Sequence, residues 1–216
     1  MIVNYGILRL QTENFMILRT YYAYVFKSIL LSSVFMLLSC GEDYVPKPKA
    51  ELRLEYPRAK YVDANLELPF AFEKNLLATK VVLKELKAST KSYGINLEYP
   101  SLKGTIFLTY KAIEKDKKSL RDFFTDAQKF TLEHTKKADE IPAYPYESNE
   151  RRVYGMLSEV KGNVASPAQF YVTDSVNHFL TGSLYFYAKP NYDSILPAAD
   201  YLQKDIKRIM ETVTWK

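Results

Sequence analysis

Cys40 is the residue whose surroundings most clearly predict a chemical reaction. It is the only cysteine in the chain, and the Leu37-Leu38-Ser39 triplet before it supplies the large aliphatic and small side chains typical of a lipoprotein signal-peptidase site. The predicted reaction is thioether attachment of a diacylglycerol to Cys40, followed by acylation of the new N-terminus with a chain such as palmitate. Each buried CH₂ adds about 0.8 kcal/mol, so several chains would give an effectively permanent anchor.

The stretch before Cys40 fits this prediction. Lys27 is followed by about a dozen mostly apolar residues, which is the length of a signal-peptide hydrophobic region and short of the roughly 20 residues that span a bilayer. The alternative is a buried helix with a core cysteine, but the run has no polar face at helical spacing. We therefore interpret residues 1–39 as a cleaved lipoprotein signal peptide. Met16 is an alternative start that would give a signal of ordinary length.

A second group with reactive side chains is Asp174, Ser175 and His178, which supplies an acid, a nucleophile and a base within five residues. A catalytic triad needs the base oriented between the other two groups, in a site that excludes water. These residues are instead expected at the tip of a turn, where Asp, Ser and Asn are common because they bond to the local backbone. We predict a turn, and no enzyme activity.

Aromatic residues offer a binding function instead. The chain has 18 tyrosines, and Tyr171, Tyr185 and Tyr187 fall on predicted strands next to the Asp174–His178 turn. Together with Asp174, Ser175 and His178 they form a candidate interaction surface for a sugar or a peptide. The alternative is that tyrosine, a good strand former, simply covers one face of a sheet.

Metal, cofactor and nucleic-acid functions find no support in the composition. There are two histidines, and His134 lies on the apolar face of a predicted helix without a histidine one turn away, so we expect no metal site and no cofactor. Once residues 1–39 are removed, 27 basic and 24 acidic residues remain. That excess is too small to indicate a nucleic-acid partner, and no small-molecule substrate is identified.

The elements that must position these residues follow from the hydrophobic pattern. Residues 40–51 are expected to be the lipidated cysteine and an extended, proline-containing tether, and 52–216 a single globular domain. Period-two alternation predicts strands near 52–57, 61–62, 70–73, 95–99 and 104–110, and an antiparallel meander over 153–160, 168–174 and 179–187. Residues 76–87 are ambiguous but favour a strand, and 141–147 read as a linker.

Two amphipathic helices complete the pattern. One is predicted to begin at Ser119, with Asp122 completing a cap signature, and the other near Ser194, with Pro197 in its first turn. Trp215 is expected to pin the end of the second helix. The predicted fold class is α+β, a mostly antiparallel sheet packed by two long amphipathic helices. By fold-level analogy alone, this order of elements looks like the Mog1/PsbP group.

With these residues laid out, the chain resembles the gliding motility lipoprotein GldD family. The resemblance rests on Cys40 and on segments in a fixed order: 44–48 (YVPKP), 95–100 (INLEYP), 105–111 (TIFLTYK), 134–138 (HTKKA), 153–155 (VYG), 162–166 (GNVAS), 169–175 (QFYVTDS), 178–186 (HFLTGSLYF), 190–194 (PNYDS) and the terminal helix to Trp215. It covers essentially all of residues 40–216.

The resemblance implies a cell-envelope lipoprotein required for gliding motility and linked to the type IX secretion machinery. It implies a membrane partner through the lipid anchor, protein partners in the gliding and secretion envelope complex, and no catalytic residue. We expect the domain to face the periplasm, with the inner or outer membrane left open. A lipid-anchored glycan- or peptide-binding module is the alternative function.

Overall fold

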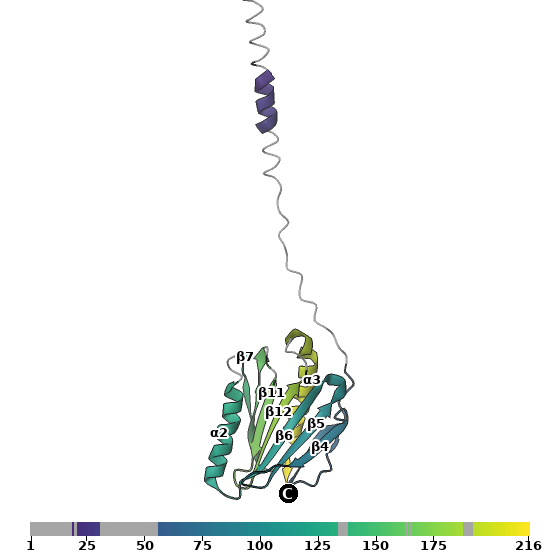
Figure 1. Cartoon of the computed structure of the whole chain (residues 1–216), viewed down its shortest axis with the longest axis vertical. Helices are drawn as coiled ribbons and strands as arrows, with labels where there is room; N and C mark the ends of the chain where they lie inside the picture. The colour runs from purple at the N-terminus through teal and green to yellow at the C-terminus, as the bar shows by residue number, and fades with distance from the viewer. Residues whose placement is uncertain are drawn as a thin grey trace, which may run out of the picture. The chain divides into compact units, whose positions relative to one another are not determined.

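The computed structural model describes residues 19, 21–30, 56–133, 138–162, 164, 166–187 and 192–216, with the side chains of 130–133 and 192–195 excepted. The chain separates into two units, 1–49 and 50–216. In the first unit, residues 21–30 are helical (Figure 1). None of the described helices is long and apolar enough to cross a membrane. Cys40, the tether and most of the predicted signal hydrophobic region lie outside the described residues.

Thirteen strands and two α-helices are described in the second unit, together with a short 3₁₀ helix, η1. They are β1 Tyr61–Asp63, β2 Phe70–Ala71, β3 Glu73–Asn75, β4 Lys80–Glu85, β5 Ser92–Tyr99, η1 Pro100–Leu102, β6 Gly104–Ala112, α2 Lys117–Glu133, β7 Ala138–Glu140, β8 Ala143–Ser148, β9 Val153–Glu159, β10 Lys161–Gly162, β11 Ala168–Thr173, β12 His178–Phe186, α3 Tyr192–Thr212 and β13 Thr214–Trp215.

A seven-stranded antiparallel sheet of order β4-β5-β6-β12-β11-β9-β8 dominates the domain (Figure 1). The predicted fold class, α+β with a mostly antiparallel sheet, is confirmed. The expected pairing of the strands near 95–99 and 104–110, and the later meander, are also present as β5-β6 and β9-β11-β12. Short connections between these strands favour antiparallel neighbours.

One face of the sheet packs against α3. On each strand every second side chain points toward this helix. Ile95, Ile106 and Leu180 are examples, and each has no exposed surface. Leu202 and Ile206 of α3 are equally buried, and both belong to the same core cluster as those strand residues. Full burial of such a side chain contributes about 1.5–3 kcal/mol, so this interface is the main source of the domain's stability. We call this side of the sheet the core face.

The opposite side of the sheet, which we call the second face, is only partly covered. There α2 packs through Phe123 and Phe124, which contact Phe179 and Tyr171 at ring-centroid distances of 5.3–5.7 Å. In Figure 1, α2 lies at one margin of the sheet, and the strands β6, β5 and β4 lie toward the opposite margin, away from α2. The sequence pattern indicated two helices on an apolar sheet, and the structure assigns them to different faces.

Two local predictions were wrong. The helix expected to begin at Ser119 begins at Lys117, because Asp116 is the capping residue: its carboxylate accepts hydrogen bonds from the N–H groups of Lys118 and Ser119 and from the Ser119 hydroxyl. Residues 141–147, expected to be a linker, include most of strand β8. Pro142 and Pro145 favoured the interpretation as a linker, but an edge strand such as β8 tolerates proline.

A buried carboxylate joins α3 to the segment that precedes the sheet. Asp205 is 1% exposed, and it accepts hydrogen bonds from the Tyr61 hydroxyl (2.7 Å) and from the Asn75 side-chain amide (2.9 and 3.1 Å). Burial raises the pKa of Asp205, while these hydrogen bonds oppose the shift. Nearby, the Tyr201 hydroxyl donates to the Pro57 carbonyl. The domain's N-terminal segment is thereby attached to α3.

Because of the buried Asp205 carboxylate, we expect the free energy of unfolding of the domain to depend on pH. Because the folded pKa lies above the ordinary value of 3.8, the folded chain holds its proton to higher pH than the unfolded chain does. The free energy of unfolding therefore falls as pH rises through that window, by about 1.4 kcal/mol per pKa unit. Asp205→Asn retains an acceptor oxygen and removes the charge, so its stability relative to wild type should rise from pH 4 to pH 7 in urea titrations.

Asp122→Asn, which makes the same chemical change at an exposed side chain of α2, is the matched control variant. Parallel wild-type and Asp205→Asn curves across this range would contradict the assignment of a raised pKa to Asp205.

Candidate functional site

The turn between β11 and β12 is organised by one carboxylate oxygen. Asp174 Oδ1 accepts hydrogen bonds from the backbone N–H groups of Val176, Asn177 and His178, at 2.9, 2.7 and 2.8 Å. Burial acts to raise the pKa of Asp174, but the three backbone donors outweigh it and hold the pKa below its ordinary value. Ser175, at the exposed tip, has a φ of 63°. The predicted turn therefore exists, with Asp174 as its organiser.

His178 is oriented by the core rather than by the turn. Its ring lies parallel to that of Trp215, with 5.0 Å between ring centroids, and its Nδ1 is 2.8 Å from the Tyr110 hydroxyl. Burial lowers the pKa of His178, although the Asp174 charge opposes the shift. Burial also raises the pKa of Tyr110 to about 12. The imidazole is thus held in a neutral aromatic cluster.

These contacts do not form an acid–base–nucleophile relay. The carboxylate of Asp174 bonds to backbone N–H groups, and among the described residues no hydrogen bond joins the Ser175 hydroxyl to the His178 ring. Within the described ranges, no cluster of histidine, cysteine or acidic side chains could hold a metal ion. The arrangement can fix backbone geometry, and it lacks the aligned base that nucleophilic catalysis requires.

The turn also positions α2. Its Asn177 and Val176 carbonyls accept hydrogen bonds from the N–H groups of Ile113 and Lys115, at 2.8 and 2.9 Å. The next residue, Asp116, caps α2. One buried carboxylate therefore determines the path of the connection that leads into the helix on the second face.

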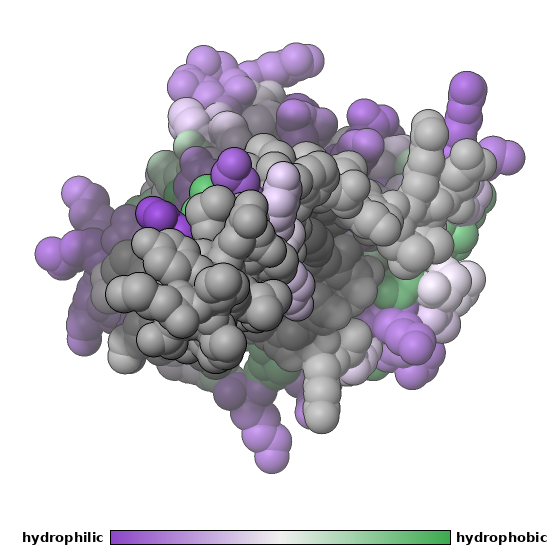
Figure 2. Space-filling view, turned by 90° about the horizontal axis from the view of Figure 1, so that it is seen from above, coloured by the Kyte–Doolittle hydropathy of each residue, from purple (hydrophilic) through white to green (hydrophobic). Residues whose placement is uncertain are grey.

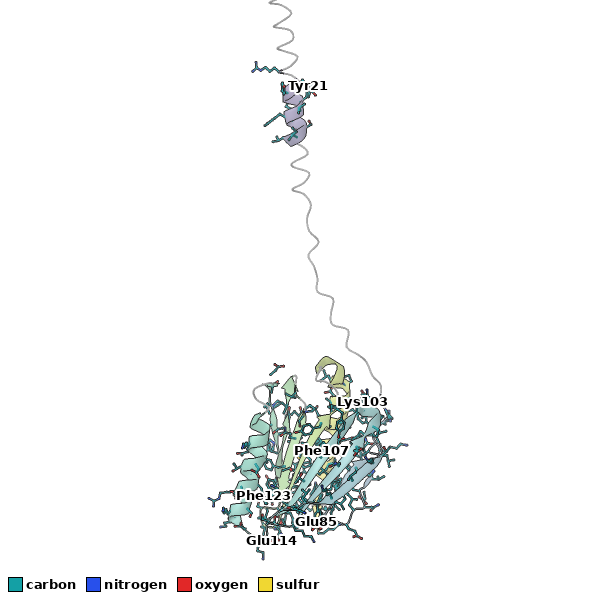
Figure 3. All side chains as sticks on the ribbon, in the orientation of Figure 1. Tyr21, Glu85, Lys103, Phe107, Glu114 and Phe123 are labelled. Carbon is teal, nitrogen blue, oxygen red and sulfur yellow. The ribbon has the colours of Figure 1, made fainter. Side chains whose placement is uncertain are left out.

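The three candidate tyrosines lie at separate places on and beyond the second face. Tyr171 is partly buried beneath α2, stacked with Phe179 at 6.0 Å. Tyr185 packs edge-to-face against Phe107, whose position in the middle of the sheet is visible in Figure 3. Tyr187 is 70% exposed, and its hydroxyl accepts a hydrogen bond from Thr105. They do not gather into one aromatic surface, and their binding role stays a prediction.

A groove of about 250 Å³ runs between α2 and the second face. The sheet lines it mainly with uncharged polar side chains, and α2 contributes Phe123 and Asp126. Lys111 lies beside both, with its Nζ 3.5 Å from Asp126 and 4.4 Å from the centre of the Phe123 ring. The polar residues of the sheet side are Thr109, Ser158, Gln169, Thr181 and Ser183. Of the predicted surface, Tyr171 alone lines this groove.

Sequence reasoning did not find the groove. Its polar residues occupy alternate positions on β6, β9, β11 and β12, and they come together only because these strands are neighbours in the sheet. The available signal was the alternation of small hydroxyl residues with large apolar ones. His134, predicted on the apolar face of its helix, lies outside the described residues, as does Cys40.

The Asp174 turn yields a stability prediction. Asp174→Ala would leave three backbone N–H groups without their charged acceptor, and loss of such bonds at a buried site costs about 2–4 kcal/mol. We expect that decrease in the free energy of unfolding, together with faster amide exchange in the first turns of α2. Urea titration and hydrogen exchange measure the two effects.

Ser175→Ala is the control for this prediction, since the Ser175 side chain is exposed and its removal should change stability by less than about 0.5 kcal/mol. If Asp174→Ala were as stable as Ser175→Ala, the organising role of the carboxylate would be refuted.

Comparison with known proteins gives one match. A family model described as gliding motility lipoprotein GldD matches residues 41–215, which is most of the chain and begins directly after Cys40. No curated protein and no solved structure matches. The analogy to the Mog1/PsbP group therefore stays a prediction.

Proposed function

Because the chain belongs to the gliding motility lipoprotein GldD family, we propose that it is a non-catalytic lipoprotein that supports assembly or stability of the gliding and type IX secretion machinery. The family itself gives the chain a role in gliding motility and a lipid-anchored location in the cell envelope. The proposal adds the attachment residue, Cys40, the absence of catalysis and the link to secretion.

The observation that carries the proposal is the position of the family match. It begins at residue 41 and ends at residue 215, so it covers the predicted mature chain after the lipidated residue except for Lys216. Cleavage before Cys40 would leave the cysteine as the new N-terminal residue, directly before the matched region. The tether that follows contains Pro46 and Pro48, which favour an extended chain and would hold the domain away from the membrane surface.

The described geometry supports a function through binding rather than catalysis. The one group that resembles a triad has its carboxylate engaged with backbone N–H groups and its imidazole stacked on Trp215. The surface offers polar contacts instead: Figure 2 shows mostly hydrophilic side chains on the coloured part of one face, with small hydrophobic areas between them. Such a surface suits contacts with other envelope proteins, and we expect the domain to lie in the periplasm.

Attachment through Cys40 is tested by substitution. Cys40→Ala removes the only thiol that could carry the diacylglycerol, so the variant should accumulate as an unprocessed precursor and lose labelling by radioactive palmitate. Ser39→Ala, which keeps a small residue before the cysteine, should be processed and labelled as wild type. Processing of Cys40→Ala at the wild-type rate would exclude the lipoprotein signal.

The role in the machinery is tested by deletion and complementation. Cells lacking the chain should lose surface spreading and should fail to export the adhesins that the type IX apparatus secretes. Complementation with Cys40→Ala should restore neither if anchoring is required, whereas complementation with Ser175→Ala should restore both, because Ser175 has no catalytic role. Normal spreading and secretion in the deletion strain would refute the proposal.

A further inference from the structure

The two edges of the seven-stranded sheet are built differently. At the β8 edge, the Pro142 carbonyl accepts a hydrogen bond from the Glu159 N–H at 3.0 Å. Every second residue counted from Pro142 therefore directs its backbone N–H and C=O groups toward β9. Pro145 therefore occupies a position whose N–H would point outward, and proline has none. This edge cannot offer a continuous row of donors to another strand.

The β4 edge has no such protection. The Leu86 N–H donates to the Ser92 carbonyl at 2.9 Å, in register with the β4-β5 ladder, so the even-numbered residues of β4 bond to β5. Val81, Leu83 and Glu85 consequently direct their N–H and C=O groups away from the sheet. Within the described part of the chain no strand pairs with this side of β4, which forms the outer strand in Figure 1.

The side chains of β4 continue both faces of the sheet to its margin. Val82 on the second face and Leu83 on the core face are 38% and 39% exposed, although both are apolar. Two lysines flank Val82. Lys80 is paired with Glu98 at 3.0 Å, whereas Lys84 makes no ion pair with any described residue.

A second copy of the chain fits this edge poorly. Suppose that two copies pair their β4 strands antiparallel about a two-fold axis normal to the sheet. Odd-numbered residues of one copy must then lie opposite odd-numbered residues of the other, because only the odd-numbered residues direct their backbone groups outward. The register centred on Val82 places Lys80 of one copy opposite Lys84 of the other, twice, and like charges directly opposite are destabilising. The register centred on Leu83 instead places Val82 opposite Lys84 and Val81 opposite Glu85, which leaves no apolar partner for either valine.

We infer that β4 accepts an extended segment of another protein as an eighth strand, and that this segment carries an acidic residue at each end of an apolar three-residue core. The acidic residues lie opposite Lys80 and Lys84, and the apolar residues lie opposite Val81, Val82 and Leu83. Main-chain hydrogen bonds to Val81, Leu83 and Glu85 supply the affinity, as in other cases of strand addition. Lysines on an exposed edge normally oppose pairing, so charge selects the partner.

The inference concerns how the domain binds and can be tested without reference to gliding. The probe is a blocked synthetic peptide with the core Glu-Val-Val-Val-Glu, added to the detergent-solubilised lipoprotein and followed by NMR hydrogen exchange. At about ten times its Kd the peptide should slow exchange of the Val81, Leu83 and Glu85 amides roughly tenfold. The Val82 and Lys84 amides, already bonded to β5, should change little. A peptide with the core Lys-Val-Val-Val-Lys should have no effect.

Three variants test the contributions of the backbone hydrogen bonds and of the lysine charge separately. Leu83→Pro removes one outward N–H and should abolish protection, whereas Glu147→Pro, at an outward position on the β8 edge, should leave it intact. Lys84→Glu changes the charge without changing the backbone and should weaken binding of the acidic peptide relative to the basic one. Unchanged spectra away from β4 would show that each variant is folded.

Several results would overturn the inference: no protection up to the solubility limit of the acidic peptide, equal protection by both peptides, or equal loss in both proline variants. Protection of Val81, Leu83 and Glu85 before any peptide is added would also overturn it. If that protection were independent of protein concentration, the chain itself would cover β4, and if it rose with concentration, a second copy would.

Discussion

The packing of α3 against one face of the antiparallel sheet is the constraint on which the rest of the domain depends. Leu202 and Ile206 are completely buried there, and the Asp205 carboxylate on the same helix secures the segment that enters the domain from the N-terminal side. Because α3 covers only one face, the second face is left to α2, which covers part of it. The groove and the partly covered tyrosines follow from this unequal coverage, whereas the open margin at β4 follows from its place at the end of the strand order.

A single carboxylate has the corresponding role on the second face. Asp174 arranges the β11-β12 turn, whose carbonyls then fix the connection into α2. The same residues had suggested an acid and a base for catalysis. In the described structure one oxygen of the carboxylate accepts from three backbone N–H groups, and the His178 Nδ1 lies against the Tyr110 hydroxyl and not against the carboxylate. Membership of the gliding motility lipoprotein GldD family directs attention to the location and the surfaces of the chain.

Much of the fold could be predicted because the relevant signals are local. Alternation of apolar and polar residues predicted β5, β6, β9, β11 and β12. The short connections within β5-β6 and within β9-β11-β12 predicted that these strands are antiparallel neighbours, as they are in the sheet. The errors also have local causes. The cap of α2 is Asp116, three residues before the predicted start. The β8 segment was interpreted as a linker because it contains proline. The Mog1/PsbP analogy and the domain boundary at residue 52 remain predictions.

The sequence by itself determined the class of fold, the turn at Asp174 and the predicted anchor at Cys40, because each depends on neighbouring residues in the chain. Only the tertiary structure decided which face each helix covers, that His178 stacks on Trp215, and that Tyr171 lies beneath α2 while Tyr187 does not. These relations join residues far apart in sequence. They depend on strand order and side-chain packing, which no local pattern encodes.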